Sequence, residues 1–125
     1  MGKSVLRDKS YLFAIRVVKL SRNLQTEMKE YVLSKQLMRS GTAVGALIRE
    51  AEFGQSKPDF INKLSIALKE ANETEYWLSL LKDTNFMNET SYKSLANDCS
   101  ELIKMLVSSI NTAKKNLNTK NTSEK

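Results

Sequence analysis

The chain has 125 residues, of which 41% are hydrophobic and 27% charged, as expected for one soluble globular domain. No stretch approaches the roughly 18 uninterrupted apolar residues of a membrane span, and no secretory signal precedes the first charged segment. The chain has no histidine and one cysteine, Cys99, which excludes an intramolecular disulfide and favours a cytoplasmic location.

The net charge of +6 is unevenly distributed along the chain. Residues 1–49 contain ten Lys or Arg and three acids, a net +7, whereas residues 50–125 contain ten and eleven, a net −1. This asymmetry favours a polyanionic partner, and a solvated basic face is the alternative. One proline and four glycines are too few for many short strands and turns, so the composition favours helices.

Residues 1–7 are expected to be flexible, and the first helix is predicted from about Asp8 to Gln25. Its apolar arc is broad and covers well over a third of the helix circumference. A wide arc predicts contact with more than one neighbouring helix. Its members are Tyr11, Phe13, Ala14, Val17, Val18, Leu20 and Leu24.

The second helix is predicted to begin near Tyr31 to Ser34 and to end near Phe53. Its apolar positions repeat every three or four residues: Leu33, Leu37, Gly41, Val44, Ile48 and Ala51. Gly41 and Gly45 stand one turn apart, and glycine inside a helix costs about 1 kcal/mol relative to alanine. We therefore expect another helix to approach closely there, and favour this packing role over a ligand-binding notch.

A tight corner separates the second and third helices. Gly54 is expected to end the second helix with a positive φ, and Ser56 to cap the third. Asp59 is placed to bond back to the cap, and Pro58, the only proline, falls in the first helical turn.

The third helix is predicted from Pro58 to about Asp83. Its main seam consists of Phe60, Leu64, Ala67, Ala71, Thr74, Leu78 and Leu81. A second apolar patch lies away from that seam and predicts a subunit interface, since a helix in an isolated bundle needs only one stripe. The patch comprises Ile66, Tyr76, Trp77 and Leu80. The alternative is that the first helix or the termini cover it within one chain.

The fourth helix is predicted to start after the capping residue Asn88 and to run to Leu117, with residues 118–125 as a disordered polar tail. Its apolar residues fall on one face: Tyr92, Leu95, Ala96, Cys99, Leu102, Ile103, Leu106, Val107, Ile110, Ala113 and Leu117. Four helices with short links predict an all-α, antiparallel up-and-down four-helix bundle over residues 8–117.

No catalytic, cofactor or metal site is predicted. The Glu-x-x-His pairs of di-metal bundles cannot exist without histidine, and Cys99 has no histidine to activate it. Glu50, Glu70 and Glu73 are interpreted as members of ion pairs rather than as ligands of a hard cation.

Nucleic-acid binding is the functional class that the residues favour most. Cations on rigid helices neutralise phosphates and release counterions, which gives affinity without sequence choice. The predicted binding residues are Arg16, Lys19, Arg22, Lys35, Arg39 and Arg49. No aromatic residues are interleaved with them for base stacking, and no named nucleic-acid motif is present.

Three segments carry a family resemblance: LSKQLMRSGTAVGALIREA at 33–51, DFINKLSIALKEA at 59–71, and ETEYWL at 73–78. They resemble the four-helix-bundle proteins of the 23S rRNA-intervening sequence family over about residues 8–117. The resemblance implies a bacterial cytoplasmic bundle without an established enzymatic activity, often a homopentamer. A related branch, the accessory variability determinant of diversity-generating retroelements, is a basic pentamer that works with a reverse transcriptase and nucleic acid.

These observations together predict a non-enzymatic homo-oligomer that binds RNA or a nucleoprotein partner through its basic surface. The alternative is a protein–protein scaffold or adaptor without nucleic-acid binding. No membrane association is expected.

Overall fold

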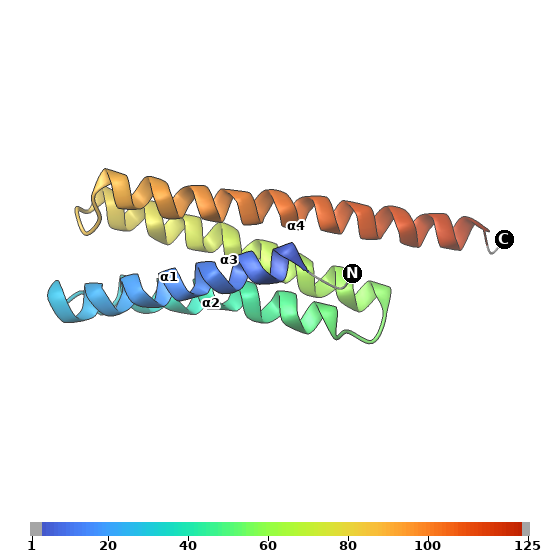
Figure 1. Cartoon of the computed structure of the whole chain (residues 1–125), viewed down its shortest axis with the longest axis horizontal. Coiled ribbons are helices and arrows are strands. Elements are labelled where there is room, and N and C mark those ends of the chain that lie inside the picture. The colour runs from blue at the N-terminus through green and yellow to red at the C-terminus, as the bar shows by residue number, and fades with distance from the viewer. Residues whose placement is uncertain (1–3, 124–125) are drawn as a thin grey trace.

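The computed structural model of the protein describes residues 4–123 and contains four helices that run back and forth (Figure 1). They are α1 (Val5–Glu27), α2 (Leu33–Glu52), α3 (Lys57–Asp83) and α4 (Glu89–Ser123). No strand occurs among the described residues, so the predicted all-α four-helix bundle is confirmed. Within the same residues no helix is long and apolar enough to cross a membrane.

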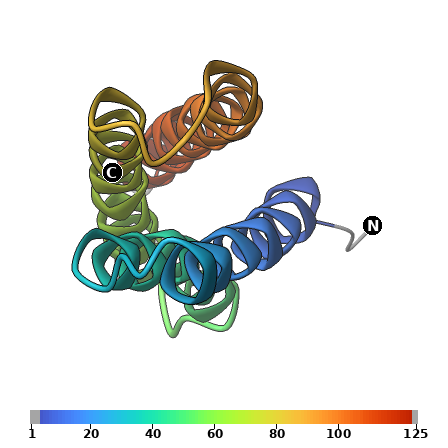
Figure 2. The same cartoon turned by 90° about the vertical axis from the view of Figure 1, so that its left-hand side faces the viewer.

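The helices form an open arc rather than a closed square. Viewed along the bundle, α1 and α4 stand at the two ends of the arc, with α2 and α3 between them (Figure 2). Packing is extensive between consecutive helices and much lighter between α1 and α4, and α1 does not contact α3 within the described residues. The first helix was predicted to contact more than one neighbour, and its second neighbour is α4, against which it packs over a small area.

One hydrophobic core contains side chains from all four helices. The predicted seams of α2 and α3 are buried or partly buried at every position. Two apolar assignments were wrong: Tyr11 is 57% exposed and Val107 is 40% exposed. Both lie at the margin of their helix's buried face, about 80–120° from a core residue such as Val17 or Cys99.

The glycines of α2 permit the close approach that their spacing predicted. A Cβ atom added to Gly41 would lie 2.7 Å from Cγ1 of Val17 on α1, closer than two carbon atoms can pack. A Cβ at Gly45 would lie 3.4 Å from the backbone oxygen of Ser10, which is an ordinary contact. Gly41 is thus a point at which α1 and α2 pack too closely for a larger residue.

All four helix starts are capped by side chains that the local sequence supplies, and those of α2, α3 and α4 adjoin the loops. The Asp59 N–H donates to Oγ of Ser56 at 3.2 Å, and the Ser91 N–H donates to Oδ1 of Asn88 at 2.8 Å, as predicted. The start of α2 has an unpredicted cap: the Glu30 carboxylate accepts backbone N–H groups at 2.7–3.2 Å. Burial alone would raise the pKa of Glu30, but these hydrogen bonds outweigh it and lower the pKa.

The prediction of a positive φ at Gly54 was wrong, because no described glycine has one. The left-handed residues are Lys29 and Asn85, in the other two loops. A Cβ at Gly54 would lie 2.6 Å from Oδ2 of Asp59, a side chain that can rotate away, and 3.1 Å from the backbone oxygen of Ala51, so the position is tight but does not require glycine.

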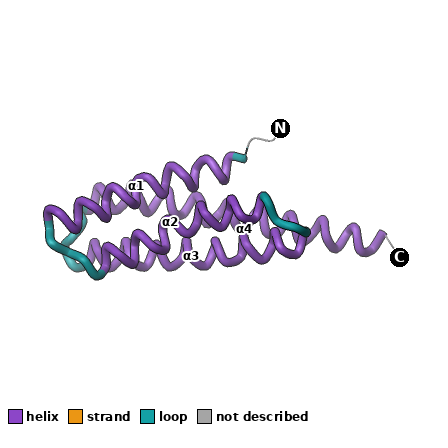
Figure 3. The backbone as a smooth tube through the Cα atoms, turned by 90° about the horizontal axis from the view of Figure 1, so that it is seen from below, coloured by secondary structure: helices purple, strands orange, loops and turns teal. Residues whose placement is uncertain are grey.

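Both outer helices are longer than predicted. α1 begins at Val5, because Oγ of Ser4 accepts the Arg7 N–H at 3.0 Å and caps the helix. α4 continues to Ser123 and projects beyond the rest of the bundle (Figure 3). Residues 118–123 contain no glycine or proline that would end the helix. The helices therefore extend into residues 5–7 and 118–123, which were predicted to be a flexible start and a disordered tail, while 1–3 and 124–125 lie outside the described residues.

Candidate nucleic-acid interface

The six basic residues predicted to bind phosphates separate into two groups. Arg16 and Arg39 are engaged in ion pairs within the chain. The other four make no ion pair among the described residues, and all four are exposed: Lys19, Arg22, Lys35 and Arg49.

Arg16 joins α1 to α4 across the open side of the bundle. Its guanidinium pairs with the Asp98 carboxylate and donates to Oγ of Ser94 at 2.9 Å. Nearby, Nζ of Lys9 lies 2.9 Å from Oε1 of Glu101. The cations on this side of α1 are thus partly neutralised by acids of α4, and they have a structural role that the sequence did not reveal.

Arg39 links α2 to α3 by ion pairs in the same way. It pairs with Glu70, at 3.2 Å, and with Glu73, whose carboxylate also accepts the Trp77 indole N–H at 3.0 Å. Glu50 pairs with Lys63 at 3.2 Å. The interpretation of these three glutamates as ion-pair members is confirmed, and no group of three metal-ligating side chains occurs among residues 4–123.

Three of the remaining cations, Arg22, Lys35 and Arg49, lie along the outer side of the α1–α2 seam, whereas Lys19 is on the outward face of α1, opposite the buried Val17. Lys35 and Arg49 are separated by fourteen residues, so they share one face of α2. The antiparallel pairing of α1 with α2 is fixed by Gln25, which donates to Oγ of Ser34 at 3.1 Å. Arg22 therefore lies across the seam from Lys35, one helical turn from that hydrogen bond.

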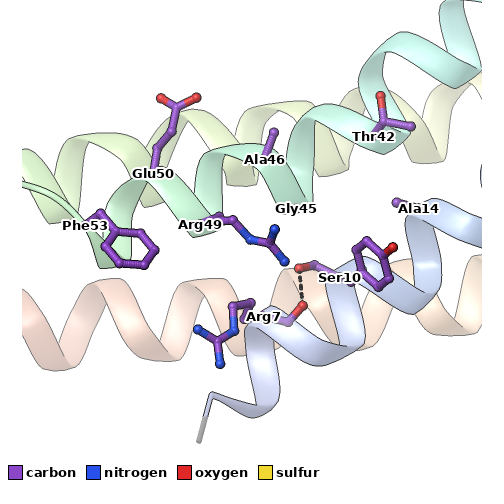
Figure 4. Close-up of a pocket in the computed structure, with 10 residues that line it drawn as sticks. Arg7, Ser10, Ala14, Thr42, Gly45, Ala46, Arg49, Glu50 and Phe53 are labelled. Carbon is purple, nitrogen blue, oxygen red and sulfur yellow. Dashed lines mark hydrogen bonds between the residues drawn. The ribbon is translucent and has the colours of Figure 1, made fainter. Parts of the chain in front are cut away.

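The opposite end of the same seam contains a groove of about 550 Å³. Figure 4 shows it between the first half of α1, with Arg7 and Ser10, and the second half of α2, with Arg49. The lining residues are Arg7, Ser10, Tyr11, Ala14, Thr42, Gly45, Ala46, Arg49, Glu50 and Phe53. Small side chains from both helices leave the groove open, and its surface is mostly apolar.

Aromatic rings flank this groove, which the sequence analysis did not predict. The Arg49 guanidinium lies over the ring of Tyr11, 5.9 Å from its centre, and Phe53 is 75% exposed. Tyr11 and Arg49 are 38 positions apart, so only the pairing of α1 with α2 brings them together. Tyr11 and Arg22 are eleven residues apart, about three helical turns, so they lie on the same face of α1. This spacing was the one signal in the sequence that could have linked the Tyr11 ring to the cations.

The chain's one thiol is not a reactive group. Cys99 is fully buried and its Sγ contacts the backbone oxygen of Ala71 at 3.3 Å. Burial, followed by the nearby charges of Glu75 and Asp98, raises the pKa of Cys99 to about 12. The prediction of a small buried hydrophobic residue is confirmed.

The predicted oligomer patch on α3 is divided between surface and core. Tyr76 is 58% exposed and Ile66 is 37% exposed, whereas Trp77 packs against the core and Leu80 is half-buried. The Tyr76 and Trp77 rings meet edge to face, with centres 4.9 Å apart. α1 does not cover the patch, which excludes that part of the intrachain alternative.

Comparisons with known proteins agree on the family. A search of curated proteins finds no match to this chain. Among solved structures, it is similar to a protein of unknown function from the S23 ribosomal protein family of Bacteroides thetaiotaomicron, with 57% identity and a TM-score of 0.84. That alignment covers 85% of this chain and 98% of the other. The family model described as 23S rRNA-intervening sequence protein matches residues 3–108, and the chain belongs to this family.

Proposed function

We propose that the protein is a non-enzymatic homo-oligomer that binds RNA, or a nucleoprotein containing RNA, through the outer side of its α1–α2 seam. The observation that supports this most is the set of exposed cations without a described ion pair at Lys19, Arg22, Lys35 and Arg49. Elsewhere the cations of α1 and α2 already have carboxylate partners in the chain, so the excess charge is concentrated where a polyanion can reach it.

The proposal excludes Arg16 and Arg39 as primary phosphate ligands, because a phosphate would have to displace their carboxylate partners. A cytoplasmic location is part of the proposal, because a lone buried thiol is typical of proteins from a reducing compartment. Five subunits are the expected assembly, by resemblance to the family.

The decisive experiment measures binding of a labelled RNA hairpin by fluorescence anisotropy at several salt concentrations. If about four phosphates are contacted per chain, the affinity falls by about a hundredfold between roughly 50 and 200 mM salt. The variant K19E/R22E/K35E is expected to lose most of the binding. Its matched control, K57E/K69E/K104E, reverses three exposed cations of α3 and α4 and keeps the wild-type affinity.

Salt-independent binding, or an equal loss in both triple variants, would contradict the proposal. The assembly is tested separately by light scattering: wild-type protein should give a mass several times that of one chain. Replacing Tyr76 with glutamate should shift that mass downward if the α3 patch is the interface, since burying the new charge is costly.

A scaffold that binds only proteins is the second candidate. It is supported by Tyr76 and Ile66, which expose apolar surface on α3 far from the basic seam. Recovery of a defined protein partner together with absence of RNA affinity at low salt would favour it.

A further inference from the structure

We propose that the groove between α1 and α2 binds an unstacked base of single-stranded RNA, with the adjoining phosphate at Arg49. This inference rests on the proposed function and makes it more specific. It assigns recognition of flexible or looped RNA to one pocket, whereas the charged seam alone would hold any RNA backbone.

The size and floor of the groove suit a flat ring. Its volume of about 550 Å³ falls within the range of small-molecule sites. Gly45 on α2 and Ala14 on α1 both line the groove, so no long side chain occupies the floor, and the Ala46 methyl lies at its outer rim, turned away from α1 (Figure 4). The apolar surface gains from excluding water, and the face of a nucleobase supplies a complementary surface.

The walls provide stacking partners. Tyr11 and Phe53 are large rings that remain 57% and 75% exposed beside the groove. RNA-binding proteins stack unpaired bases on aromatic rings and on the planes of arginine guanidinium groups. The Arg49–Tyr11 pair offers both kinds of surface at one position.

The charge of the groove is complementary to a nucleotide. The two glutamates at this end of α2 each have a cation partner: Glu50 pairs with Lys63 and Glu52 with Arg7, at 3.2 and 3.3 Å. No described ion pair involves Arg49, and the one carboxylate that lines the groove, Glu50, is already paired, so a phosphate in the groove meets an available cation. Asp8, which has no described ion pair, lies in the adjoining hollow beside Arg49 and not in the groove. This arrangement favours an anionic ligand over a neutral apolar one.

The seam continues from the groove to further cations. Lys35 lies fourteen residues from Arg49 on α2, a distance of about 21 Å along the helix. Arg22 and Lys35 can therefore hold the backbone of the neighbouring nucleotides while one base occupies the groove. The combination of one stacking pocket and a line of cations is typical of single-strand binding.

The test compares a labelled single-stranded oligoadenylate RNA with a fully paired RNA duplex of equal length. The variant A46L places a longer side chain at the rim of the groove from an exposed position on α2, and Y11A removes a stacking wall from an exposed position on α1. Each should weaken single-strand binding about tenfold and leave duplex binding unchanged. The control S65L adds the same side chain to an exposed site on α3 and should alter neither.

A 2-aminopurine base in the single strand gives a second readout, because stacking quenches its fluorescence, and A46L should abolish the quenching. Unchanged single-strand affinity in A46L and Y11A, or equal losses for both RNAs, would overturn the inference while the salt-dependent binding above still stands. A change of oligomeric mass in A46L would also overturn it, by identifying the groove as a subunit contact. Failure of the wild type to bind any RNA would instead refute the proposed function itself.

Discussion

The two sides of α1 meet their neighbours in opposite ways. Toward α2, the Val17 side chain packs directly against Gly41, small residues line the seam, and exposed cations such as Arg22 keep no described carboxylate partner. Toward α4, packing is light and the contact depends on the ion pairs of Lys9 and Arg16. One helix thus has a side held by close packing and a side held by charge.

This difference separates structural charge from charge that is available to a partner. Gly41 lets α1 and α2 pack closely, and one described ion pair, Arg7–Glu52, joins them near one end. The cations that have no described partner, such as Arg22, are therefore not required for this packing. On the α4 side few apolar contacts exist, and opposite charges bridge the gap instead. A count of basic residues in the sequence treats both groups alike, whereas the packing distinguishes them.

The largest expected effect concerns the inner side of α4. At pH 8 the buried thiol of Cys99, with a pKa of about 12, has about a thousandfold less thiolate than an ordinary thiol with a pKa of 9.0. Alkylation in native protein should be slower by at least that factor, and fast in urea. Rapid native labelling, followed by mass spectrometry, would mean that the light α1–α4 contact opens to expose α4.

The next effect tests the close seam with a matched pair of glycines. Gly41→Ala places a methyl group 2.7 Å from Val17, whose branched side chain cannot turn away, so we expect a loss of about 1–3 kcal/mol in unfolding free energy. Gly45→Ala meets only ordinary contacts and should be neutral or stabilising by up to about 1 kcal/mol. Urea unfolding measures both.

Restoring space should rescue the first variant: V17A/G41A should be more stable than an additive sum of the two single variants predicts. Equal stability of the two glycine variants would show that the α1–α2 contact is not as close as described.

A smaller effect is expected where α1 is joined to α2. Glu30→Gln weakens the cap of α2 and should cost roughly 0.5–1 kcal/mol at neutral pH. Because the pKa of Glu30 is lowered in the folded protein, its contribution is complete above the ordinary value of 4.5 and is lost as the pH falls below it. Wild type and variant should therefore converge in acid, and a constant difference from pH 7 to pH 3 would contradict the assignment.

The smallest effect concerns the charged side. Arg16→Gln or Asp98→Asn should each cost about 0.2–1 kcal/mol, less in high salt, because both side chains are around 40% exposed. A double-mutant cycle isolates the pair from its surroundings. A coupling that is absent at low salt would remove the distinction between the two sides of α1.

The seams of α2 and α3 and the caps at Ser56 and Asn88 could be predicted because each depends on residues within one or two helical turns. Burial of Leu64 and Leu78, or capping by Asn88, follows from local spacing and backbone hydrogen bonding. The two glycines of α2 also predicted a close contact with another helix, because no local interaction compensates the helix stability that glycine loses relative to alanine.

The sequence by itself thus determined four amphipathic rods, their order and their buried faces, together with a surplus of cations in the first half of the chain. Only the tertiary structure decided that Arg16 and Arg39 are neutralised by acids about 80 and about 30 positions away, and that Tyr11 meets Arg49 beside an open groove. The physical reason is the distance along the sequence over which each interaction acts. Helix formation and its apolar period are set by neighbours in sequence, whereas ion pairs, grooves and exposed seams depend on which rods lie side by side and how closely they pack.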